Sequence, residues 1–247
     1  MQLTYEFIAK RIDHSLLGPT LTDTDLEAGC RLAASYNVAS VCIKPYAVKL
    51  AKRLLMGTDV KVGTTVGFPH GGHLTSVKVF EAERAMDDGA TELDMVINIG
   101  QALGGQWSAV HDDIAAVVEA AHKRDAIVKV IFENCYLSPA EIVKLCKICG
   151  EVRADYVKTS TGYGSGGATH EDLKLMRDAS PAHVKLKAAG GIRNLDEAIA
   201  VAQLGCDRIG ASRTAEILDT LKDRLQGVTT KKPSANVSRE TPGSGGY

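Results

Sequence analysis

Eight strand-like segments alternate with eight helix-like segments along this chain, and this regularity constrains the fold more than any other feature. Apolar β-type runs predict strands near residues 11–15, 38–44, 60–67, 92–98, 127–133, 155–160, 183–188 and 207–211. The amphipathic stretches between them predict helices near residues 23–36, 45–56, 75–88, 108–124, 139–149, 170–178, 194–204 and 214–225. Such alternation indicates a parallel sheet with crossover helices. Eight units favour an α/β fold closed into a single (β/α)8 TIM barrel over an open doubly wound sheet.

Several predicted helices begin beside a residue that can cap the first turn. The candidate N-caps are Thr22, Thr75, Ser138, Thr169, Asn194 and Ser212. Pro139 follows Ser138 and fits the first helical position, where its missing N–H has no intrahelical partner to lose.

The length of 247 residues suits one barrel of this type, which typically has about 250 residues. No linker interrupts the alternation, so residues 1–226 are predicted to form one domain. Residues 227–247 differ, because they are rich in Thr, Ser, Lys, Pro and Gly and have almost no apolar side chains. We expect them to form a short, flexible, disordered tail.

Composition narrows the range of partners. The net charge of −1 gives no global basic field that would attract nucleic acid. No apolar run approaches the ~18 residues that a membrane span needs, and the first residues lack the apolar core of a signal peptide. The six scattered cysteines are interpreted as reduced thiols. We therefore expect a cytoplasmic protein that acts on small molecules, without a nucleic-acid or membrane partner.

Two predicted strands near the C-terminal end each finish with a lysine, Lys158 in DYVKTSTG and Lys187 in HVKLKAAGG. A desolvated ammonium must find partners or lose its proton, and a neutral amine is a nucleophile. Period-two alternation places Asp94 on an interior face, and places Lys129 and Glu133 together on one face of the next strand. Because a barrel carries its chemistry at the C-terminal ends of its strands, these side chains are candidate site residues.

Two glycine-containing turns predict an anion site beside these lysines. Gly190–Gly191 follows the seventh predicted strand, and Gly210–Ser212 ends the eighth. Turns in these two positions, with backbone N–H groups and a helix N-terminus, are the usual phosphate-binding place of this fold. Glycine allows the backbone to approach an anion without a clashing Cβ. The sequence therefore predicts a phosphate seat next to two candidate amines.

The residues alone leave other interpretations open. The charged side chains can be an internal ion network that only orients the strands. A phosphosugar isomerase on the same fold would use a carboxylate base, with Glu133 as the candidate, and would form no covalent intermediate. A phosphate-binding barrel without catalysis would use its lysines only to hold the ligand.

Six stretches resemble those of the deoxyribose-phosphate aldolase family. They are IDHSLL (12–17), VGFPHGG (66–72), ELDMVINIG (92–100), VKTSTGYGSGGAT (157–169), VKLKAAGGIR (184–193) and IGAS (209–212), and the resemblance covers about residues 5–226. It implies a class I aldolase that needs no metal or other cofactor. Such an enzyme reversibly cleaves 2-deoxy-D-ribose 5-phosphate to D-glyceraldehyde 3-phosphate and acetaldehyde in deoxyribonucleoside catabolism. The resemblance also implies a homodimer or larger homo-oligomer.

The resemblance implies a role for each matching residue. It makes Lys158 the Schiff-base former, Lys187 the second catalytic lysine and Asp94 the catalytic aspartate. It implies phosphate contacts from the turns that contain Thr161, Gly162, Gly190, Gly191, Gly210 and Ser212.

Three positions fall outside this pattern. Tyr163 stands where some relatives have a lysine that helps to hold phosphate, and Lys185 stands where many have a small residue. The last residue, Tyr247, matches a C-terminal tyrosine that assists proton exchange in some relatives, but we do not include it among the catalytic residues.

Other potential ligands have plainer interpretations. His70 and His73 are expected to face solvent in a turn, because no third metal ligand is evident. Cys146 and Cys149 are expected to be small buried residues of one helix, and Cys42 a buried structural thiol rather than a reactive one. The sequence therefore predicts no metal site.

Overall fold

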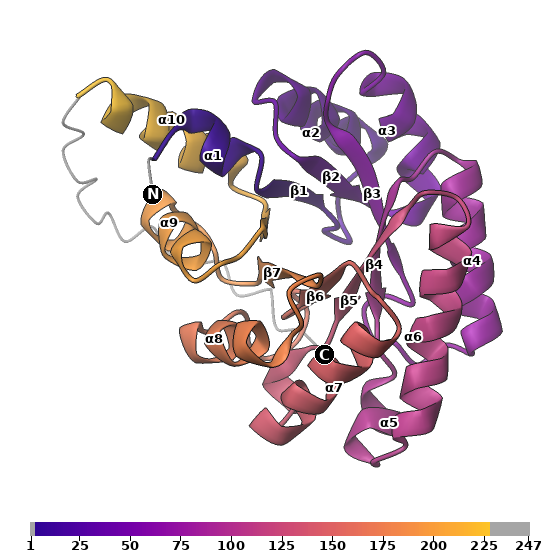
Figure 1. Ribbon diagram of the computed structural model, residues 1–247. Helices are drawn as coiled ribbons and strands as arrows, with labels where there is room; N and C mark the ends of the chain where they lie inside the picture. The colour runs from indigo at the N-terminus through magenta and orange to yellow at the C-terminus, as the bar shows by residue number, and fades with distance from the viewer. Residues whose placement is uncertain (1–2, 228–247) are drawn as a thin grey trace.

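Eight parallel strands close into a barrel in this computed structural model, which describes residues 3–227. The strands are β1 (Ile12–Leu16), β2 (Ser40–Ile43), β3 (Lys61–Val66), β4 (Glu92–Val96), β5 (Ile127–Ile131), β6 (Tyr156–Lys158), β7 (Lys185–Ala189) and β8 (Arg208–Ala211). Each strand pairs in parallel with the next, and β8 pairs with β1 to close the ring (Figure 1). The predicted (β/α)8 TIM barrel is confirmed.

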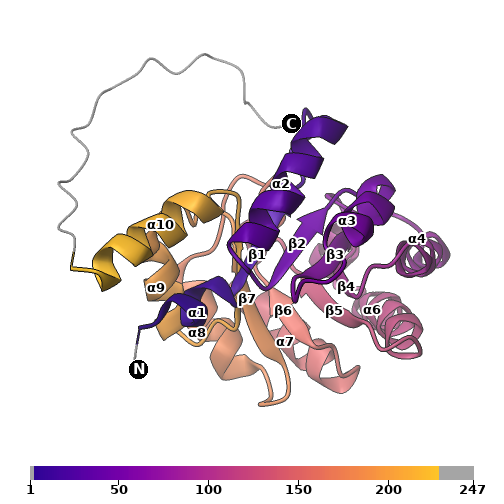
Figure 2. The same cartoon turned by 90° about the horizontal axis from the view of Figure 1, so that it is seen from above.

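The helices form a layer around the barrel (Figures 1 and 2). They are α1 (Tyr5–Ala9), α2 (Asp23–Ser35), α3 (Val48–Leu54), α4 (Thr75–Asp87), α5 (Ile99–Leu103), α6 (Trp107–His122), α7 (Pro139–Glu151), α8 (His170–Ala179), α9 (Leu195–Gln203) and α10 (Thr214–Leu225). Two 3-10 turns, η1 (Pro45–Ala47) and η2 (Asn134–Tyr136), follow β2 and β5. The first and last helices, α1 and α10, pack side by side, so the two ends of the barrel domain meet.

Period-two alternation separates two kinds of core. Leu93 and Met95 of β4 are fully buried in the apolar layer between strands and helices. Asp94 lies between them in sequence and is also fully buried, but it bonds to charged side chains inside the barrel. The parallel register sets Asp94 beside Lys129 of β5, so like positions of neighbouring strands point into the same interior.

Four of the six predicted helix caps are confirmed, because Thr22, Ser138, Thr169 and Asn194 each accept a backbone N–H of their helix. Two are wrong. Thr75 is the first residue of α4, and its hydroxyl donates to the carboxylate of Asp113 at 2.8 Å instead. Ser212 lies one residue before Arg213, which occupies the N-cap position of α10 and makes no side-chain cap bond.

The element boundaries differ from the predicted ones where strands turn into loops. Strands β4, β5 and β6 end at Val96, Ile131 and Lys158, about two residues earlier than predicted, because the backbone there leaves the ladder to form the loops around the barrel mouth. The predicted helix at 45–56 begins with the 3-10 turn η1, whose first residue is Pro45. The short helices α1 and α5 were not predicted.

Residues 228–247, including Tyr247, lie outside the described residues, so the domain boundary at 226 and the disordered tail stay predictions. Among residues 3–227, no helix combines the length and the apolar character needed to cross a membrane.

Candidate active site

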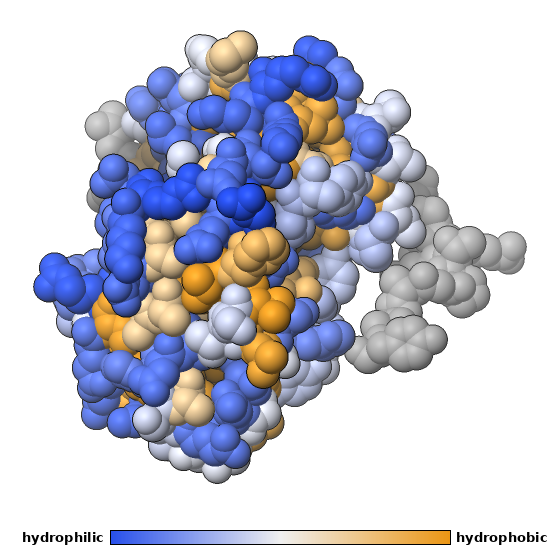
Figure 3. Space-filling view, turned by 90° about the vertical axis from the view of Figure 1, so that its right-hand side faces the viewer, coloured by the Kyte–Doolittle hydropathy of each residue, from blue (hydrophilic) through white to orange (hydrophobic). Residues whose placement is uncertain are grey.

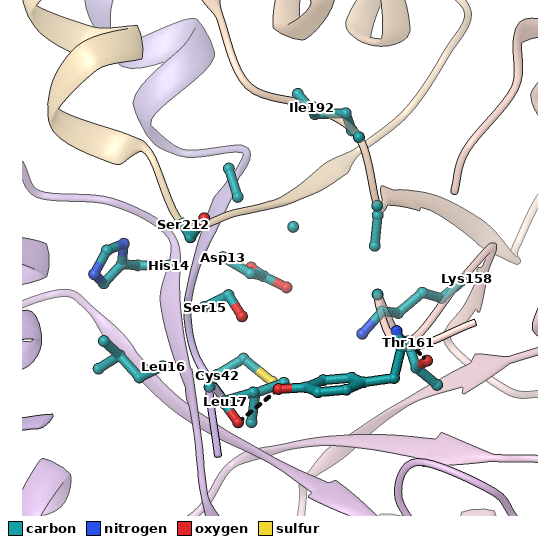
Figure 4. A pocket seen from close by; sticks show the side chains of 18 of the residues that line it. Asp13, His14, Ser15, Leu16, Leu17, Cys42, Lys158, Thr161, Ile192 and Ser212 are labelled. Atoms are coloured by element: carbon teal, nitrogen blue, oxygen red, sulfur yellow. Dashed lines mark hydrogen bonds between the residues drawn. The ribbon is translucent and has the colours of Figure 1, made fainter. Parts of the chain in front are cut away.

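A cavity of about 610 Å³ opens at the C-terminal ends of the strands. Its lining residues come from β1, β2, β6, β7, β8 and the loops that follow them. Eight of the nine residues predicted for the site line it: Lys158, Lys187, Thr161, Gly162, Gly190, Gly191, Gly210 and Ser212. Figure 4 shows Asp13 and Ser15 on the same side of β1 as Lys158, whereas His14 and Leu16 lie on the other side. The ninth predicted residue, Asp94, is fully buried beneath the cavity.

The floor of the cavity is a group of two lysines around one aspartate. Both Lys158 Nζ and Lys187 Nζ donate to Asp94 Oδ2 at 2.7 Å. The parallel register places Lys158 of β6 directly beside Lys187 of β7. All three side chains are buried, so each charge is compensated by its neighbours rather than by water. The structure thus brings the three predicted catalytic residues together.

A second tier of charged side chains supports this floor from below. Lys187 Nζ also donates to Asp13 Oδ2 at 2.5 Å, and Lys129 Nζ lies 2.9 Å from Asp94 Oδ1. Lys129 in turn bonds to Glu92 Oε2 at 2.6 Å, and Arg208 bonds to Glu92 and to Asp13. Sequence reasoning assigned no role to Asp13 or Arg208. The sequence pattern that could have indicated Asp13 is its carboxylate within the apolar run IDHSLL.

The floor and its support hold more cations than anions. Three carboxylates, Asp13, Glu92 and Asp94, face four cationic side chains, Lys129, Lys158, Lys187 and Arg208. One of the four therefore lacks a matching charge, and it is favoured to lose its proton.

Lys158 is the cationic side chain that this excess of positive charge favours to lose its proton. Burial lowers the pKa of Lys158, and the charge of Lys187 lowers it further, while the carboxylate of Asp94 opposes both; the net shift is downward. Burial also acts to lower the pKa of Lys187, but the carboxylates of Asp13 and Asp94 outweigh it and raise the pKa overall. The two neighbouring lysines are thus driven in opposite directions, which favours a neutral Lys158 beside a charged Lys187.

The carboxylate of Asp94 stays ionised in this setting. Burial alone would raise its pKa, but the charges of Lys129 and Lys187 and the contact with Lys158 hold it well below its ordinary value. Lys129 remains charged for the matching reason: burial lowers its pKa, and the carboxylates of Asp13 and Asp94 outweigh that effect and raise the pKa well above normal.

The rim of the cavity is made of glycine turns. Gly162 and Gly191 both adopt φ of +90°, a conformation that other residues rarely adopt, and a Cβ at either position would enter open space. Their backbone N–H groups donate to no acceptor within the described part of the chain. Gly190 differs, because a Cβ there would lie 2.8 Å from the Cα of Gly167, so this glycine is also needed for close packing of two loops.

Thr161 is occupied by another residue of the loops. Its backbone N–H lies 3.2 Å from Glu133 Oε1, and its hydroxyl donates to Glu133 Oε2. Glu133 is buried, adopts a left-handed backbone conformation with φ of +59°, and is not among the cavity-lining residues. The predicted candidate base of an isomerase therefore holds a loop and does not face the cavity.

One further cation reaches the rim. Arg193 lines the cavity, and its side chain is exposed. It follows the glycines of the seventh turn by two residues, in the stretch AAGGIR, and sequence reasoning gave it no role. Because Arg193 and Gly191 line the same cavity, the arginine adds a charged donor to the one that the Gly191 N–H offers.

The remaining sequence candidates have separate locations. Lys185 lies at the opposite end of β7, exposed, with Nζ 5.6 Å from the ring centre of Tyr156. Cys42 lines the cavity, and burial raises the pKa of its thiol to about 11, which disfavours the reactive thiolate. His70 and His73 are exposed.

The two helical cysteines, Cys146 and Cys149, are buried in α7, as predicted. Among the described residues, no group of three or more His, Cys, Asp or Glu side chains is arranged to hold a metal ion.

A closed barrel with two buried lysines at the C-terminal ends of its strands is the architecture of a TIM-barrel enzyme that uses a lysine in its chemistry. The comparison with protein families agrees with this class and specifies it. Residues 7–230 match the model described as "DeoC/LacD family aldolase". The chain belongs to this family.

Deoxyribose-phosphate aldolases from several organisms are similar to this chain along nearly their whole length. The chain is 53% identical over 221 residues to a deoxyribose-phosphate aldolase of Rhodopirellula baltica, covering 90% of this chain and 92% of the relative. It is 49% identical to one of Thermococcus gammatolerans, covering 86% and 95%. A tetrameric deoxyribose phosphate aldolase from Aeropyrum pernix superposes with a TM-score of 0.83 at 30% identity, covering 90% of this chain and 93% of that chain.

Proposed function

We propose that this chain is a class I deoxyribose-phosphate aldolase, a lyase that reversibly cleaves 2-deoxy-D-ribose 5-phosphate to D-glyceraldehyde 3-phosphate and acetaldehyde. The observation that carries the proposal is the pair Lys158 and Lys187 on one carboxylate, with the two lysine pKa values shifted in opposite directions. Membership in the aldolase family and the identity to deoxyribose-phosphate aldolases support the same reaction.

Lys158 is the nucleophile in this proposal. Its neutral Nζ attacks C1 of the open-chain sugar; the hydroxyl of the resulting carbinolamine then takes up a proton and leaves as water, which gives a protonated imine. Buried lysines with a depressed pKa are suited to this step, because only the unprotonated amine carries a lone pair. Lys187 stays charged beside it and disfavours a second ammonium, since like charges nearby shift a pKa away from the charged form.

The imine then acts as an electron sink for the C–C cleavage. Loss of the proton from the C3 hydroxyl breaks the C2–C3 bond, releases D-glyceraldehyde 3-phosphate and leaves an enamine on Lys158. Asp94 contacts both lysines through one oxygen, so it is suited to relay protons together with Lys187. Protonation of the enamine at C2 and hydrolysis of the resulting imine release acetaldehyde and restore the lysine.

The phosphate seat lies at the rim in this proposal. Gly162 and Gly191 offer unengaged N–H groups, and Arg193 and Ser212 line the same cavity. Gly190 allows close packing of the turn after β7, and Gly210 of β8 leaves room for β7, because a Cβ there would lie 3.1 Å from Ala189 Cβ and 3.6 Å from Lys187 Cε. Thr161 holds the loop that carries Gly162 and donates no hydrogen bond to phosphate, because its N–H and hydroxyl are already bonded to Glu133. Binding of the remote phosphate helps to orient C1 at Lys158.

Product analysis separates this function from the alternatives. With 2-deoxy-D-ribose 5-phosphate as substrate, we expect acetaldehyde and D-glyceraldehyde 3-phosphate in equal amounts, detected by two coupled dehydrogenase assays. An isomerase would convert the sugar phosphate without acetaldehyde, and a binding protein would return it unchanged. Chelators are expected to leave the rate intact, because the proposed steps use no metal.

We also propose self-association and a cytoplasmic location. Exposed apolar side chains gather over α4, including Leu74, Val77 and Phe80, and Figure 3 shows hydrophobic residues together on this side of the molecule. Contiguous exposed apolar surface often marks a protein–protein contact. The tetrameric structural relative supports a homo-oligomer. Light scattering is expected to give a mass above that of one 26.3 kDa chain.

A further inference from the structure

The side chain of Tyr163 connects three loops at the mouth of the barrel. Its Oη donates to the carbonyl oxygen of Leu17 at 2.8 Å, the dashed line at Leu17 in Figure 4. Its ring packs edge-to-face on Phe68, with ring centres 5.5 Å apart. Tyr163 belongs to the loop after β6, Leu17 to the loop after β1 and Phe68 to the loop after β3. These strands are not neighbours in the barrel, so the tyrosine reaches across the opening.

The backbone at Tyr163 is fixed by a short series of hydrogen bonds. The N–H of Tyr163 donates to Thr161 Oγ1 at 3.0 Å, and Thr161 donates both its N–H and its hydroxyl to Glu133. Gly164 packs against this carboxylate, because a Cβ there would lie 3.0 Å from Glu133 Cδ. A buried carboxylate that accepts two donors is a firm anchor, so the backbone that carries the ring is held in place.

The position of the ring matches the limit of the cavity. The lining residues come from β1, β2, β6, β7 and β8 with their loops, and Tyr163 is one of them. Phe68, on the far side of the ring, belongs to the loop after β3 and is outside the lining. Tyr163 therefore stands between the cavity and the part of the mouth above β3.

We propose that Tyr163 is a specificity-determining residue that forms the wall of the cavity on the β3 side and limits the size of the aldehyde that can react with the enamine. The inference rests on the proposed aldolase function. Tyr163 and Lys158 line the same cavity, so a bulky or branched aldehyde that fills the β3 side of this cavity must displace the ring. The hydrogen bond to Leu17 and the packing on Phe68 resist that displacement.

Two substitutions separate the hydrogen bond from the ring. Tyr163→Phe removes only the contact with Leu17 and keeps the packing on Phe68. Tyr163→Ala removes the wall. The measured quantity is the ratio of kcat/KM for addition of acetaldehyde to 3-phenylpropanal over that for addition to D-glyceraldehyde 3-phosphate. We expect Tyr163→Ala to raise this ratio by about tenfold or more, the scale on which pocket size discriminates substrates. Tyr163→Phe should raise it by a smaller factor.

Tyr46→Phe is the matched control. Tyr46 is also an exposed tyrosine whose Oη bridges two segments, donating to Asp23 Oδ1 at 2.9 Å, and it is not among the cavity-lining residues. Removing the hydroxyl of Tyr46 should leave the ratio of the two kcat/KM values unchanged.

A ratio that is unaltered or lowered in Tyr163→Ala would overturn the inference, whether activity on the two aldehydes is kept or falls equally. Failure of the wild-type chain to cleave 2-deoxy-D-ribose 5-phosphate would instead refute the proposed function, so the two failures are distinguishable.

Discussion

The floor and the rim of the cavity are built from different parts of the polypeptide. At the floor, buried side chains of strands are proposed to carry the chemistry: Lys158 and Lys187 both donate to Asp94 at 2.7 Å. At the rim, exposed turns offer backbone N–H groups for the proposed phosphate contacts, and Gly162 and Gly191 are the turn residues whose N–H groups have no acceptor among the described residues. Strands fix side-chain positions closely, whereas glycine turns offer N–H groups and close approach.

This difference teaches how the two regions should respond to substitution. A change in the floor alters the protonation of several coupled groups at once, because every charge there compensates another. A change at the rim alters one contact to the substrate and leaves the amine chemistry in place. Substitutions in the floor should therefore act on all substrates, and substitutions in the glycine turns of the rim mainly on phosphorylated substrates.

The largest effect is expected at the floor, for Lys187→Leu. Loss of this charge removes a neighbour that disfavours the ammonium form of Lys158, so the pKa of Lys158 should rise. The basic-going limb of the imine-formation profile should then move upward in pH, and activity should fall by at least about 10²-fold. The profile is measured by borohydride trapping with acetaldehyde across a pH series.

Lys129→Leu is the control for the loss of a buried charge. It also removes an ammonium that contacts Asp94, but Lys129 does not line the cavity. Circular dichroism establishes that each variant is folded. A limb that stays in place for Lys187→Leu, or that moves equally for Lys129→Leu, would show that Lys187 has no specific influence on Lys158.

An intermediate effect is expected at the rim, for Gly191→Ala. The new Cβ enters open space at the cavity and obstructs the approach of an anion. We expect kcat/KM for 2-deoxy-D-ribose 5-phosphate to fall by about tenfold, the value of one charged hydrogen bond. Activity toward unphosphorylated 2-deoxyribose should change much less, because that substrate has no phosphate to lose.

Gly57→Ala controls for the backbone conformation. Gly57 has φ of +84° with no atom within 4 Å of an added Cβ, and it lies in the turn before β3, outside the cavity lining. It carries a similar conformational penalty without an anion nearby. Equal losses on both sugars in Gly191→Ala would mean that this glycine shapes the barrel and does not bind phosphate.

The smallest effect is expected at the other end of the barrel, for Lys185→Ala. This lysine is exposed and contributes a cation–π contact with Tyr156. We expect the free energy of unfolding to decrease by about 0.5–1 kcal/mol, measured by urea titration. Activity should stay within about twofold of wild type, as for most surface substitutions. A large loss of activity would contradict the restriction of the chemistry to one end.

The sequence predicted the floor well because strand alternation is a strict geometric rule. Asp94, Lys158 and Lys187 all face the interior by this rule, which leaves them free to meet there. The support beneath was less visible, since Asp13 and Arg208 approach from strands far apart in the sequence and join only when β8 closes on β1.

The rim was predicted in part, because loop contacts do not follow a period. The glycines of the rim were predicted because glycine is the residue type that such turns favour. The bond between Thr161 and Glu133 depends on a left-handed backbone at Glu133, which no sequence pattern indicates. The residue type of Ser212 likewise predicts a helix cap, but the loop continues past it and α10 begins two residues later.

Borohydride trapping of the substrate imine tests the central claim most directly. Reduction in the presence of acetaldehyde or 2-deoxy-D-ribose 5-phosphate should attach the carbon chain irreversibly to Lys158. Mass mapping should locate the adduct in the tryptic peptide 154–174, which retains Lys158 because a modified lysine resists cleavage. The variant Lys158→Met should give no adduct. An adduct on Lys187 alone, or no adduct with active protein, would contradict the assignment of Lys158 as the nucleophile.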